Sequence, residues 1–210
     1  MCGVILSAGA SSRMGRDKAL LPWPPAADGS SKSDSETLLS AAIAALKPFT
    51  EAVVVVAGSN ANNIAPVIRA NGASMVRNPA PERGQFSSLQ VGLHEVLARA
   101  CNAAMITLVD CPPLSKASME KLRVSFDQAL ANGKWGVAPE HNGKRGHPLV
   151  VGRGMIDAFL AAPVTSNARE VKRAHAKMIE PVNVADSFLS ADLNTPEEYE
   201  ALARGRSKPF

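Results

Sequence analysis

The residues best suited to chemistry lie near the start of the chain, in the stretch VILSAGASSRMGRDKALLP at residues 4–22. Residues 4–6 are apolar and long enough for one short buried strand. The loop after them is small and polar, and Gly9 and Gly15 let its backbone turn or approach a ligand closely. Residues 19–21 are good helix formers. The stretch therefore predicts a strand, a loop and a helix, in that order.

The side chains of this loop suit an anionic ligand. Ser11 and Ser12 can cap the predicted helix, and the open amides at such a helix start attract phosphate. Arg13 offers a planar fork of donors and Lys18 a mobile positive charge, and both residue types bind phosphate oxygens. This part of the chain therefore predicts a phosphate-binding loop.

The loop matches neither of the two common phosphate-binding motifs. A Walker A loop has four residues between its glycines and ends in Gly-Lys-Ser/Thr. Here five residues separate Gly9 from Gly15, and Ala19 follows Lys18. The dinucleotide fingerprint G-x-G-x-x-G is also missing from this stretch of the sequence.

The loop resembles the pattern L-A-A-G-x-S-x-R-M-G-x-x-K-x-L-L-P of the MobA-like NTP transferase family, and most closely its molybdenum cofactor cytidylyltransferase-like (MocA-type) group. Ser7 departs conservatively, and the matching positions are Leu6, Ala8, Gly9, Ser11, Arg13, Met14, Gly15, Lys18, Leu20, Leu21 and Pro22. The resemblance implies an α/β fold: a three-layer, Rossmann-like nucleotide-diphospho-sugar transferase fold with a mostly parallel central sheet. It also implies that Arg13 and Lys18 are catalytic and that the nucleotide is bound by Leu6, Ala8, Gly9, Ala10, Ser11, Met14 and Gly15.

A second segment, NPAPERGQFSSLQVGL at residues 78–93, leads into a predicted helix. The resemblance implies that an N-P-x(4)-G-x-x-S-S-L segment at this place helps to hold the base and the ribose. The residues that it assigns to nucleotide binding are Asn78, Gly84, Gln85 and Ser88. A plain helix start, capped by one of the two serines, explains the same segment.

Asp110 follows the apolar run 104–109, which predicts a buried strand. A carboxylate at the carboxyl end of a central strand lies on the ligand-binding edge of a sheet, and Mg²⁺ prefers carboxylate, phosphate and water oxygens. The D-x-P at Asp110 resembles the family's metal-binding motif, although an aspartate here could also cap the next helix. The closing phrase DLNTPEEY resembles the one that ends these enzymes, and the resemblance implies that Asp192 is a second Mg²⁺ ligand. A helix capped by Thr195 explains the phrase equally well.

Two later segments resemble the acceptor side of the family. Gly146 and His147 belong to a G-x-P segment that borders the acceptor site in such enzymes, and a charged hairpin tip is the other interpretation. Residues 165–176 predict a basic helix, in which Arg169 either contacts an acceptor anion or faces solvent. Asn167 and Ala168 depart from the glycine and acidic residue that usually precede this arginine in the family.

Composition limits the classes of protein that remain. The chain has 210 residues, 46% of them hydrophobic and 4% aromatic, so we expect an aliphatic core. The net charge of +4 suits an anionic small molecule better than a nucleic acid. We expect no membrane partner, because the sequence contains no run of eighteen apolar residues. Three cysteines without metal-type spacing favour a reducing cytoplasm over a disulfide scaffold.

The rest of the chain alternates strand and helix patterns. Apolar runs predict strands at 52–57, 74–77, 135–139 and 180–184, and amphipathic stretches predict helices at 37–46, 64–71, 119–131 and 155–161. This alternation predicts βαβ units and a mainly parallel sheet. Residues 22–36 are rich in Pro, Ser, Gly and Asp, and indicate an inserted loop that is either solvated or a lid over the nucleotide. We expect one nucleotidyltransferase domain over residues 1–203, a tail over 204–210, and a monomer or weak homo-oligomer.

The combined expectation is a Mg²⁺-dependent nucleotidyltransferase. It would move an NMP, with CTP the favoured donor, to a phosphate-bearing small molecule, with molybdopterin the favoured acceptor, and release pyrophosphate. Two alternatives remain open: a sugar- or polyol-phosphate nucleotidyltransferase, and a non-catalytic nucleotide-binding protein on the same fold.

Overall fold

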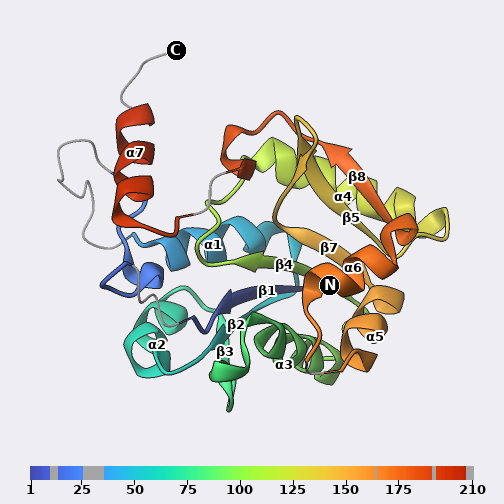
Figure 1. Ribbon diagram of the computed structural model, residues 1–210, viewed down its shortest axis with the longest axis horizontal. Helices are drawn as coiled ribbons and strands as arrows, with labels where there is room; N and C mark the ends of the chain where they lie inside the picture. Colours follow the sequence, from blue (N-terminus) through green and yellow to red (C-terminus); the bar gives the residue numbers. More distant parts are fainter. Residues whose placement is uncertain (10–13, 26–35, 164, 191–192, 207–210) are drawn as a thin grey trace.

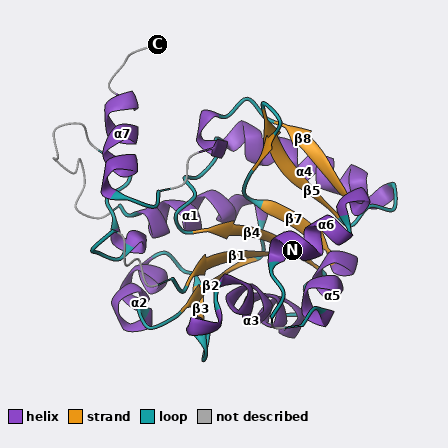
Figure 2. Ribbon diagram, in the orientation of Figure 1, coloured by secondary structure: helices purple, strands orange, loops and turns teal. Residues whose placement is uncertain are grey.

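The computed structural model describes residues 1–9, 14–25, 36–163, 165–190 and 193–206 (Figures 1 and 2). The strands are β1 (Cys2–Ser7), β2 (Ala52–Ala57), β3 (Ser74–Arg77), β4 (Ala103–Leu108), β5 (Gly136–His141), β6 (Lys144–Arg145), β7 (Leu149–Gly152) and β8 (Ile179–Asn183). The α-helices are α1 (Leu38–Leu46), α2 (Ala61–Ala70), α3 (Gln85–Ala98), α4 (Lys116–Ala131), α5 (Arg153–Ala161), α6 (Ala168–Ala174) and α7 (Pro196–Arg206). Short 3-10 turns include η1 (Lys18–Leu20), η3 (Pro81–Arg83) and η5 (Ser187–Ser190).

The strands form one sheet in the order β3-β2-β1-β4-β7-β5-β6, with β8 paired to β5. The first four strands are parallel, and Gly3 of β1 lies opposite Val53 of β2 and Met105 of β4. β7 runs antiparallel to β4 and β5, while β8 runs parallel to β5. The chain moves outward from β1 to β3 and then returns through α3 to β4 on the other side of β1. The strand order therefore reverses beside β1, and open α/β sheets bind ligands at such a point.

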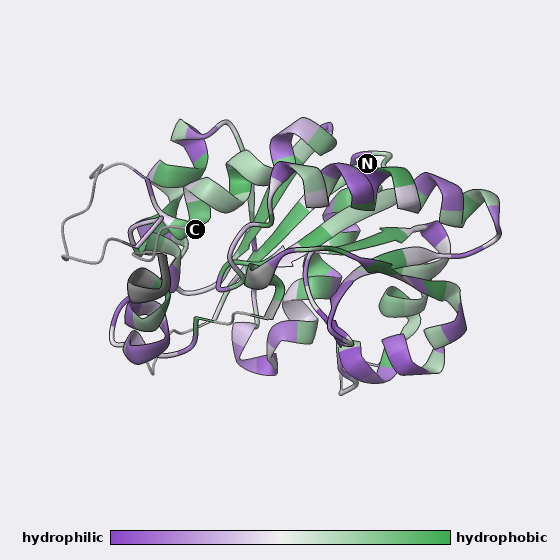
Figure 3. Cartoon of the chain, turned by 90° about the horizontal axis from the view of Figure 1, so that it is seen from above, coloured by the Kyte–Doolittle hydropathy of each residue, from purple (hydrophilic) through white to green (hydrophobic). Residues whose placement is uncertain are grey.

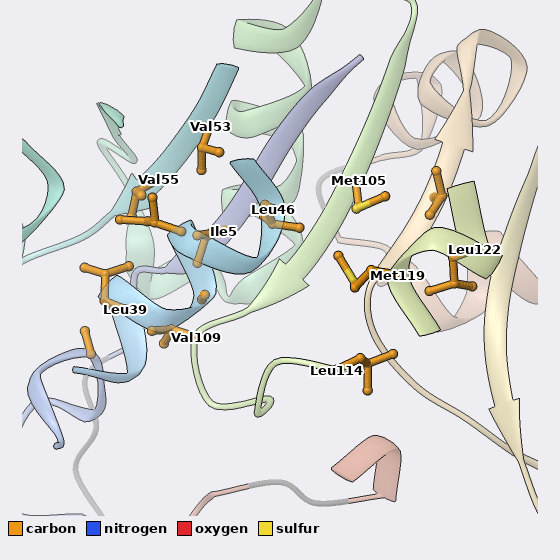
Figure 4. Packing of buried hydrophobic residues seen from close by; sticks show 14 of the residues in the cluster. Ile5, Leu39, Leu46, Val53, Val55, Met105, Val109, Leu114, Met119 and Leu122 are labelled. Atoms are coloured by element: carbon orange, nitrogen blue, oxygen red, sulfur yellow. The ribbon is translucent and has the colours of Figure 1, made fainter. Parts of the chain in front are cut away.

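Helices cover both faces of the sheet. On one face α1 and α4 bring Leu39 and Leu122 into a buried cluster with Ile5 (Figure 4), and α2 adds Ile64. On the other face α3, α5 and α6 pack against the sheet, as in the contact of Leu93 with the cluster around Val4. Figure 1 shows α1 and α3 on opposite sides of β1, and Figure 3 shows hydrophobic colour along the strands and polar residues on the outer helices. The three-layer α/β fold with a mostly parallel sheet is thereby confirmed.

A third, smaller apolar cluster joins the two ends of the chain. It contains Met14, Leu21, Trp23, Leu38, Ala41 and Leu193, with Tyr199 and Leu202 of α7 packed against it. The Tyr199 hydroxyl also donates a hydrogen bond to the Pro22 carbonyl. Figure 1 accordingly shows α7 beside the segment that follows β1. The closing segment of the chain thus reaches the loop that the sequence singles out for chemistry.

The helix predicted at residues 19–21 is wrong, because only the single 3-10 turn η1 forms there. Its N-cap is Asp17, whose Oδ1 accepts a hydrogen bond from Ala19 N at 3.0 Å, while the predicted caps Ser11 and Ser12 lie outside the described residues. Leu21 is already extended, and its carbonyl accepts a hydrogen bond from Leu38 N at 2.8 Å.

Most other predicted elements form. β2 and β3 have the predicted bounds, and α1 begins with a capping box between Thr37 and Ser40. The basic helix is shorter than predicted, because α6 starts after its N-cap Asn167 and ends at Ala174. The expected tail from residue 204 is partly helical, since α7 continues to Arg206. No helix among the residues that the structure describes is long and apolar enough to span a bilayer.

The close packing of α3 on the sheet generates a stability prediction for Gly92. A Cβ at this position would lie 2.7 Å from Val4 Cγ1 and 3.0 Å from Val56 Cγ2, and both valines are fully buried. Helix propensity alone would make Gly92→Ala stabilising by about 1 kcal/mol, whereas overpacking a core costs roughly 1–3 kcal/mol. Because valine side chains are stiff, we expect the overpacking to dominate. Urea unfolding should show a loss of up to about 2 kcal/mol.

The surface substitution Gln128→Ala on α4 is the control, and it should change the free energy of unfolding by less than about 0.5 kcal/mol. If Gly92→Ala is as stable as the unmodified protein or more so, the tight contact between α3 and the sheet is wrong.

Candidate active site

The carboxyl ends of β1 and β4 bring a lysine and an aspartate together. Lys18 Nζ lies 3.0 Å from Asp110 Oδ2 and 3.0 Å from Asn194 Oδ1. The Lys18 side chain is 11% exposed and that of Asp110 is 24% exposed, so water screens this pair less than it would screen a surface ion pair. The structure thus places two of the residues predicted to be catalytic in direct contact, at the edge where the strand order reverses.

Asn194 is held in place by the start of α7. Glu198 Oε2 accepts hydrogen bonds from Asn194 N at 2.7 Å and from Thr195 N at 3.0 Å, and Thr195 Oγ1 accepts one from Glu198 N at 3.3 Å. The closing phrase of the sequence therefore works as a helix cap. The same cap fixes an amide oxygen against the Lys18 ammonium, a contact that the sequence did not reveal.

Asn60, the N-cap of α2, connects two strand ends to Asp17, the residue before Lys18. Its Nδ2 donates to Ser7 O at 3.0 Å and to Asp17 Oδ2 at 2.8 Å, and its Oδ1 accepts from Gly58 N at 3.1 Å. Asp17 in turn caps η1 through Ala19 N. We call this arrangement the Asn60–Asp17 clip. It fixes the end of β1, the end of β2 and the turn η1, which begins at Lys18.

Sequence reasoning missed both residues of the Asn60–Asp17 clip. The local signals were an aspartate directly before Lys18 and a Gly-Ser-Asn turn after β2. Neither signal indicates that the two side chains meet, because they are 43 positions apart and only the parallel pairing of β1 with β2 brings them together.

A cavity of about 370 Å³ opens beside the end of β1. Its lining contains six of the residues predicted to bind the nucleotide, together with Ser59, Pro81 and Glu82; the six are Leu6, Ala8, Gly9, Gly84, Gln85 and Ser88. Gly84 has φ of +90°, a conformation that favours glycine, and it lets the chain turn from η3 into α3. The volume falls within the range of small-ligand sites.

Asn78, which the sequence predicts to bind the nucleotide, lies at the end of β3 and contacts the first turn of α3. It is buried, and its Nδ2 donates to Ser87 Oγ and Ser88 Oγ, each at 2.9 Å, while its Oδ1 accepts from Ala80 N at 3.0 Å. These contacts attach the first turn of α3 to the end of β3. The N-cap of α3 is Gly84, so the predicted serine cap is wrong. The hydroxyl groups of Ser87 and Ser88 instead accept hydrogen bonds from the buried Asn78 side chain.

The remaining loop predictions divide between buried and undescribed residues. Met14 is buried in the cluster that joins the chain ends, and Gly15 is exposed with φ of +70°. Ala8 lies so close to Gly58 that a Cβ on that glycine would come within 2.6 Å of Ala8 O. The predicted residues Ala10, Ser11, Arg13 and Asp192 lie outside the described residues.

Gly146 and His147, which the sequence predicts to bind the acceptor, contact η5 and β4 respectively. A Cβ on Gly146 would lie 2.6 Å from Leu189 Cδ1 and 2.7 Å from Leu189 O, so only glycine fits against η5. His147 Nδ1 lies 3.2 Å from Ile106 O. With Cys111 it also lines a cavity of about 10 Å³, which holds one water at most. These contacts place His147 near Cys111, the residue that follows Asp110.

Arg169 lies on α6 and belongs to a group of three cations with Lys172 and Arg145. Burial lowers the pKa of the Lys172 ammonium, and the positive charges of Arg169 and Arg145 lower it further. Arg145 Nε donates to Glu140 Oε2 at 3.3 Å. We call these three side chains the α6–β6 basic cluster. A bound anion would relieve the repulsion among them.

A doubly wound sheet with a charged pair at its switch point and a small-ligand cavity beside its glycine-containing loop defines a nucleotide-binding α/β protein. Residues 3–179 match the family model described as the MobA-like NTP transferase domain, and the chain belongs to this family. It is a nucleotidyltransferase of MobA/MocA type.

Two curated proteins are similar over nearly the whole chain. The molybdenum cofactor cytidylyltransferase of Escherichia coli K12 is 25% identical over 198 residues, covering 90% of this chain and 93% of the relative. The nicotine blue oxidoreductase of Paenarthrobacter nicotinovorans is 29% identical over 206 residues, covering 95% of each chain.

Solved structures share the fold at lower sequence identity. Rv0371c from Mycobacterium tuberculosis superposes with a TM-score of 0.75 at 19% identity over 97% of this chain and 98% of its own, and it has also been solved in complex with manganese. A nucleotidyl transferase from Methanothermobacter thermautotrophicus gives a TM-score of 0.73 at 17% identity over 99% of this chain and 98% of its own. At these identities the comparison supports the fold alone.

The Asn60–Asp17 clip generates a prediction for Asn60→Ala. The substitution removes hydrogen bonds to Ser7 O, Gly58 N and the Asp17 carboxylate, and a bond to a charged group contributes roughly 1.5–3 kcal/mol. We expect urea unfolding to show a loss of about 1–3 kcal/mol. The matched control is Asn63→Ala, an exposed asparagine in α2, which should stay within about 0.5 kcal/mol of the unmodified protein. Equal stability of the two variants would show that the clip does not hold these segments together.

Proposed function

We propose that this nucleotidyltransferase moves an NMP, CMP being the favoured group, from an NTP to a phosphate-bearing acceptor, with molybdopterin the favoured acceptor and Mg²⁺ the cofactor. Pyrophosphate leaves. The observation that carries the proposal is the contact between Lys18 and Asp110, at the same carboxyl edge of the sheet as the cavity at the end of β1. A cation and a carboxylate at one ligand-binding edge suit a triphosphate and its divalent ion.

The reaction is a displacement at phosphorus. An oxygen of the acceptor phosphate forms a bond to the α-phosphorus of the NTP, while the bond from that phosphorus to the bridging oxygen of pyrophosphate breaks. The second pKa of a phosphate group is about 6, so the acceptor is mostly dianionic at neutral pH and needs no strong general base. Catalysis then depends on positioning the two substrates and neutralising their charge.

The chain's own residues would divide this work. Lys18 would neutralise charge on the phosphates and on the leaving pyrophosphate, and Arg13 of the same loop would add a second cation. Backbone amides of residues 8–15 would hold the β- and γ-phosphates. The cavity lined by Gly84, Gln85 and Ser88 would receive the nucleoside. The Asn60–Asp17 clip would keep the lysine in position.

Asp110 would hold Mg²⁺, with Asp192 as a second ligand. A partly exposed carboxylate at a strand end fits this ion, which takes one or two protein carboxylates and completes its shell with substrate phosphates and water. Within the described ranges no three His, Cys, Asp or Glu side chains gather into a metal site. When bound, it would neutralise negative charge on the phosphate oxygens. The manganese complex of Rv0371c supports a divalent ion on this fold.

The donor and the acceptor rest on different observations. The similarity to the molybdenum cofactor cytidylyltransferase supports CTP and a molybdopterin acceptor. The α6–β6 basic cluster supports a phosphate-bearing acceptor. Its three cations repel one another, and a bound anion would offset that repulsion. A sugar- or polyol-phosphate acceptor would use the same cations.

The similarity to nicotine blue oxidoreductase makes electron transfer the competing activity. Thermal shift with CTP, GTP, ATP and UTP, each with Mg²⁺, separates the nucleotides, since a bound ligand raises the melting temperature. Pyrophosphate release with molybdopterin and with sugar phosphates then identifies the acceptor. Parallel incubation with NADH or NADPH tests for oxidation of a nicotinamide. Oxidation without pyrophosphate release would replace the proposal.

Removal of either charged partner should abolish most turnover. Lys18→Ala removes a cation from the developing pyrophosphate, and Asp110→Ala removes the ligand assigned to the metal. We expect each to lower kcat for pyrophosphate release by roughly 10²–10³-fold, measured with saturating NTP and Mg²⁺. Lys116→Ala and Asp127→Ala, which change exposed residues of the same types on α4, are the controls and should keep full activity. Wild-type turnover by Lys18→Ala would refute the assignment.

The α6–β6 basic cluster generates a pH-dependent prediction for Lys172→Met. The folded-state pKa of Lys172 lies below its ordinary value of 10.5, so its charged form destabilises the fold at neutral pH. That penalty is complete below the folded-state pKa and disappears as the pH rises toward 10.5. We expect Lys172→Met to raise the melting temperature at pH 7, with an advantage that shrinks at alkaline pH.

Pyrophosphate should stabilise the unmodified protein more than Lys172→Met if the cluster binds an anion. The exposed Lys177 provides the control substitution Lys177→Met, which should show neither effect. A lower melting temperature for Lys172→Met at pH 7 would mean that the ammonium is satisfied in the folded protein.

A further inference from the structure

Two thiols lie in contact at the end of the sheet opposite the candidate active site. Cys2 Sγ is 2.8 Å from Cys101 Sγ, and both residues are buried. This separation is within 1 Å of a disulfide bond length of about 2.05 Å. Cys2 opens β1 whereas the candidate site lies beyond Ser7 at its other end, which is roughly 17 Å away along an extended strand. The proposed reaction does not use this pair.

Rigid elements hold both sulfurs in position. Cys2 is fixed by parallel pairing with Ala52 of β2 and Ala104 of β4. Cys101 follows α3 in a turn where Ala100 has φ of +57° and Cys101 N donates to Val96 O at 3.1 Å. This is the Schellman arrangement, with alanine where glycine is usual. Because the backbone on both sides is ordered by hydrogen bonds, the contact between the thiols is a property of the fold.

We propose that Cys2 and Cys101 form a disulfide in the folded protein when a two-electron thiol oxidant is supplied. The bond would join the start of β1 to the end of α3 and close a loop that spans nearly half of the chain. It would act as a redox-dependent staple of the sheet. The inference does not depend on which nucleotide or acceptor the enzyme uses.

The chemistry can be followed with diamide, an azo compound that oxidises thiols. Cys101, the less completely buried of the two, adds through sulfur to one nitrogen of the N=N bond, and its proton passes to the other nitrogen. Cys2 then attacks the Cys101 sulfur, loses its proton and displaces the hydrazine. The two thiols lose two protons and two electrons, and the N=N bond gains them to become a hydrazine.

Formation of the disulfide should be slow but selective for Cys2 and Cys101. Burial, followed by the hydrogen bond to Cys101, raises the pKa of the Cys2 thiol to about 12, so this thiol is protonated at neutral pH. A protonated thiol is a poor nucleophile in solution. Contact with its partner converts the second step into an intramolecular reaction, which compensates for low nucleophilicity. Cys111 has a different neighbourhood, beside His147 and Pro112.

The experiment uses the full chain carrying Cys111→Ser, because tryptic cleavage after Arg99 and Lys116 would otherwise leave Cys101 and Cys111 on one peptide. The folded protein is treated with diamide, denatured, alkylated and weighed. We expect a mass lower by about 2 Da with no alkylation, and a linked pair of tryptic peptides 1–13 and 100–116. The melting temperature should rise by roughly 5–10 °C and return to its starting value with dithiothreitol.

Cys2→Ser in the same background is the control, and diamide should leave its melting temperature unchanged. Two alkylated cysteines after treatment of the folded protein would overturn the proposal, as would disulfides found only between two chains. Nucleotide-dependent thermal shifts measured before and after oxidation keep this result separate from the proposed function. A formed staple with no nucleotide binding would refute the function and leave the staple intact.

Discussion

The contact between the Lys18 ammonium and the Asp110 carboxylate is the interaction on which the candidate site depends. A lysine that is only 11% exposed has lost most of its hydration, and a dehydrated charge without a partner costs several kcal/mol. The carboxylate after β4 and the amide oxygen of Asn194 offset this cost. Because the three residues come from the two ends and the middle of the chain, all three segments must fold together before the lysine is satisfied. The apolar cluster that contains Trp23 and Leu193 packs the two ends of the chain together. It thereby helps to position Lys18 and Asn194.

Local patterns predicted the elements whose causes are local. The β-branched run of β2 and the short β3 have their predicted bounds, since turn residues enclose each of them. The helix expected at 19–21 failed for a tertiary reason: the Leu21 carbonyl accepts a hydrogen bond from Leu38 N, and this requires extended backbone where a helix would continue. The expected tail from residue 204 begins within α7, which continues to Arg206. The periodicity of the sequence does not reveal the hydrogen bond between Leu38 N and the Leu21 carbonyl.

The site was predictable in its residue types more than in its arrangement. Lys18 and Asp110 could be selected because each follows a strand end within a motif that resembles a known family. Asn78 stands in an equally good motif, yet its amide holds two serines of α3 and does not line the cavity. Asn60 belongs to no such pattern, although it joins two strand ends to the Asp17 cap. Which side chains meet across strand ends depends on strand order, and strand order is decided by packing between distant segments.

The two curated relatives carry names from different classes of chemistry, so the assignment of this chain to nucleotidyl transfer depends on its site as well as on its fold. An electron-transfer reaction does not by itself require side chains that neutralise phosphate groups. Nucleotidyl transfer gathers a triphosphate and an acceptor phosphate at one place, and their repulsion must be neutralised before the phosphorus can be attacked. A dehydrated lysine and a carboxylate suited to a divalent ion, at the switch point of the sheet and at the same sheet edge as a small cavity, meet this requirement. The charges at this edge therefore argue for phosphate chemistry more strongly than either name does.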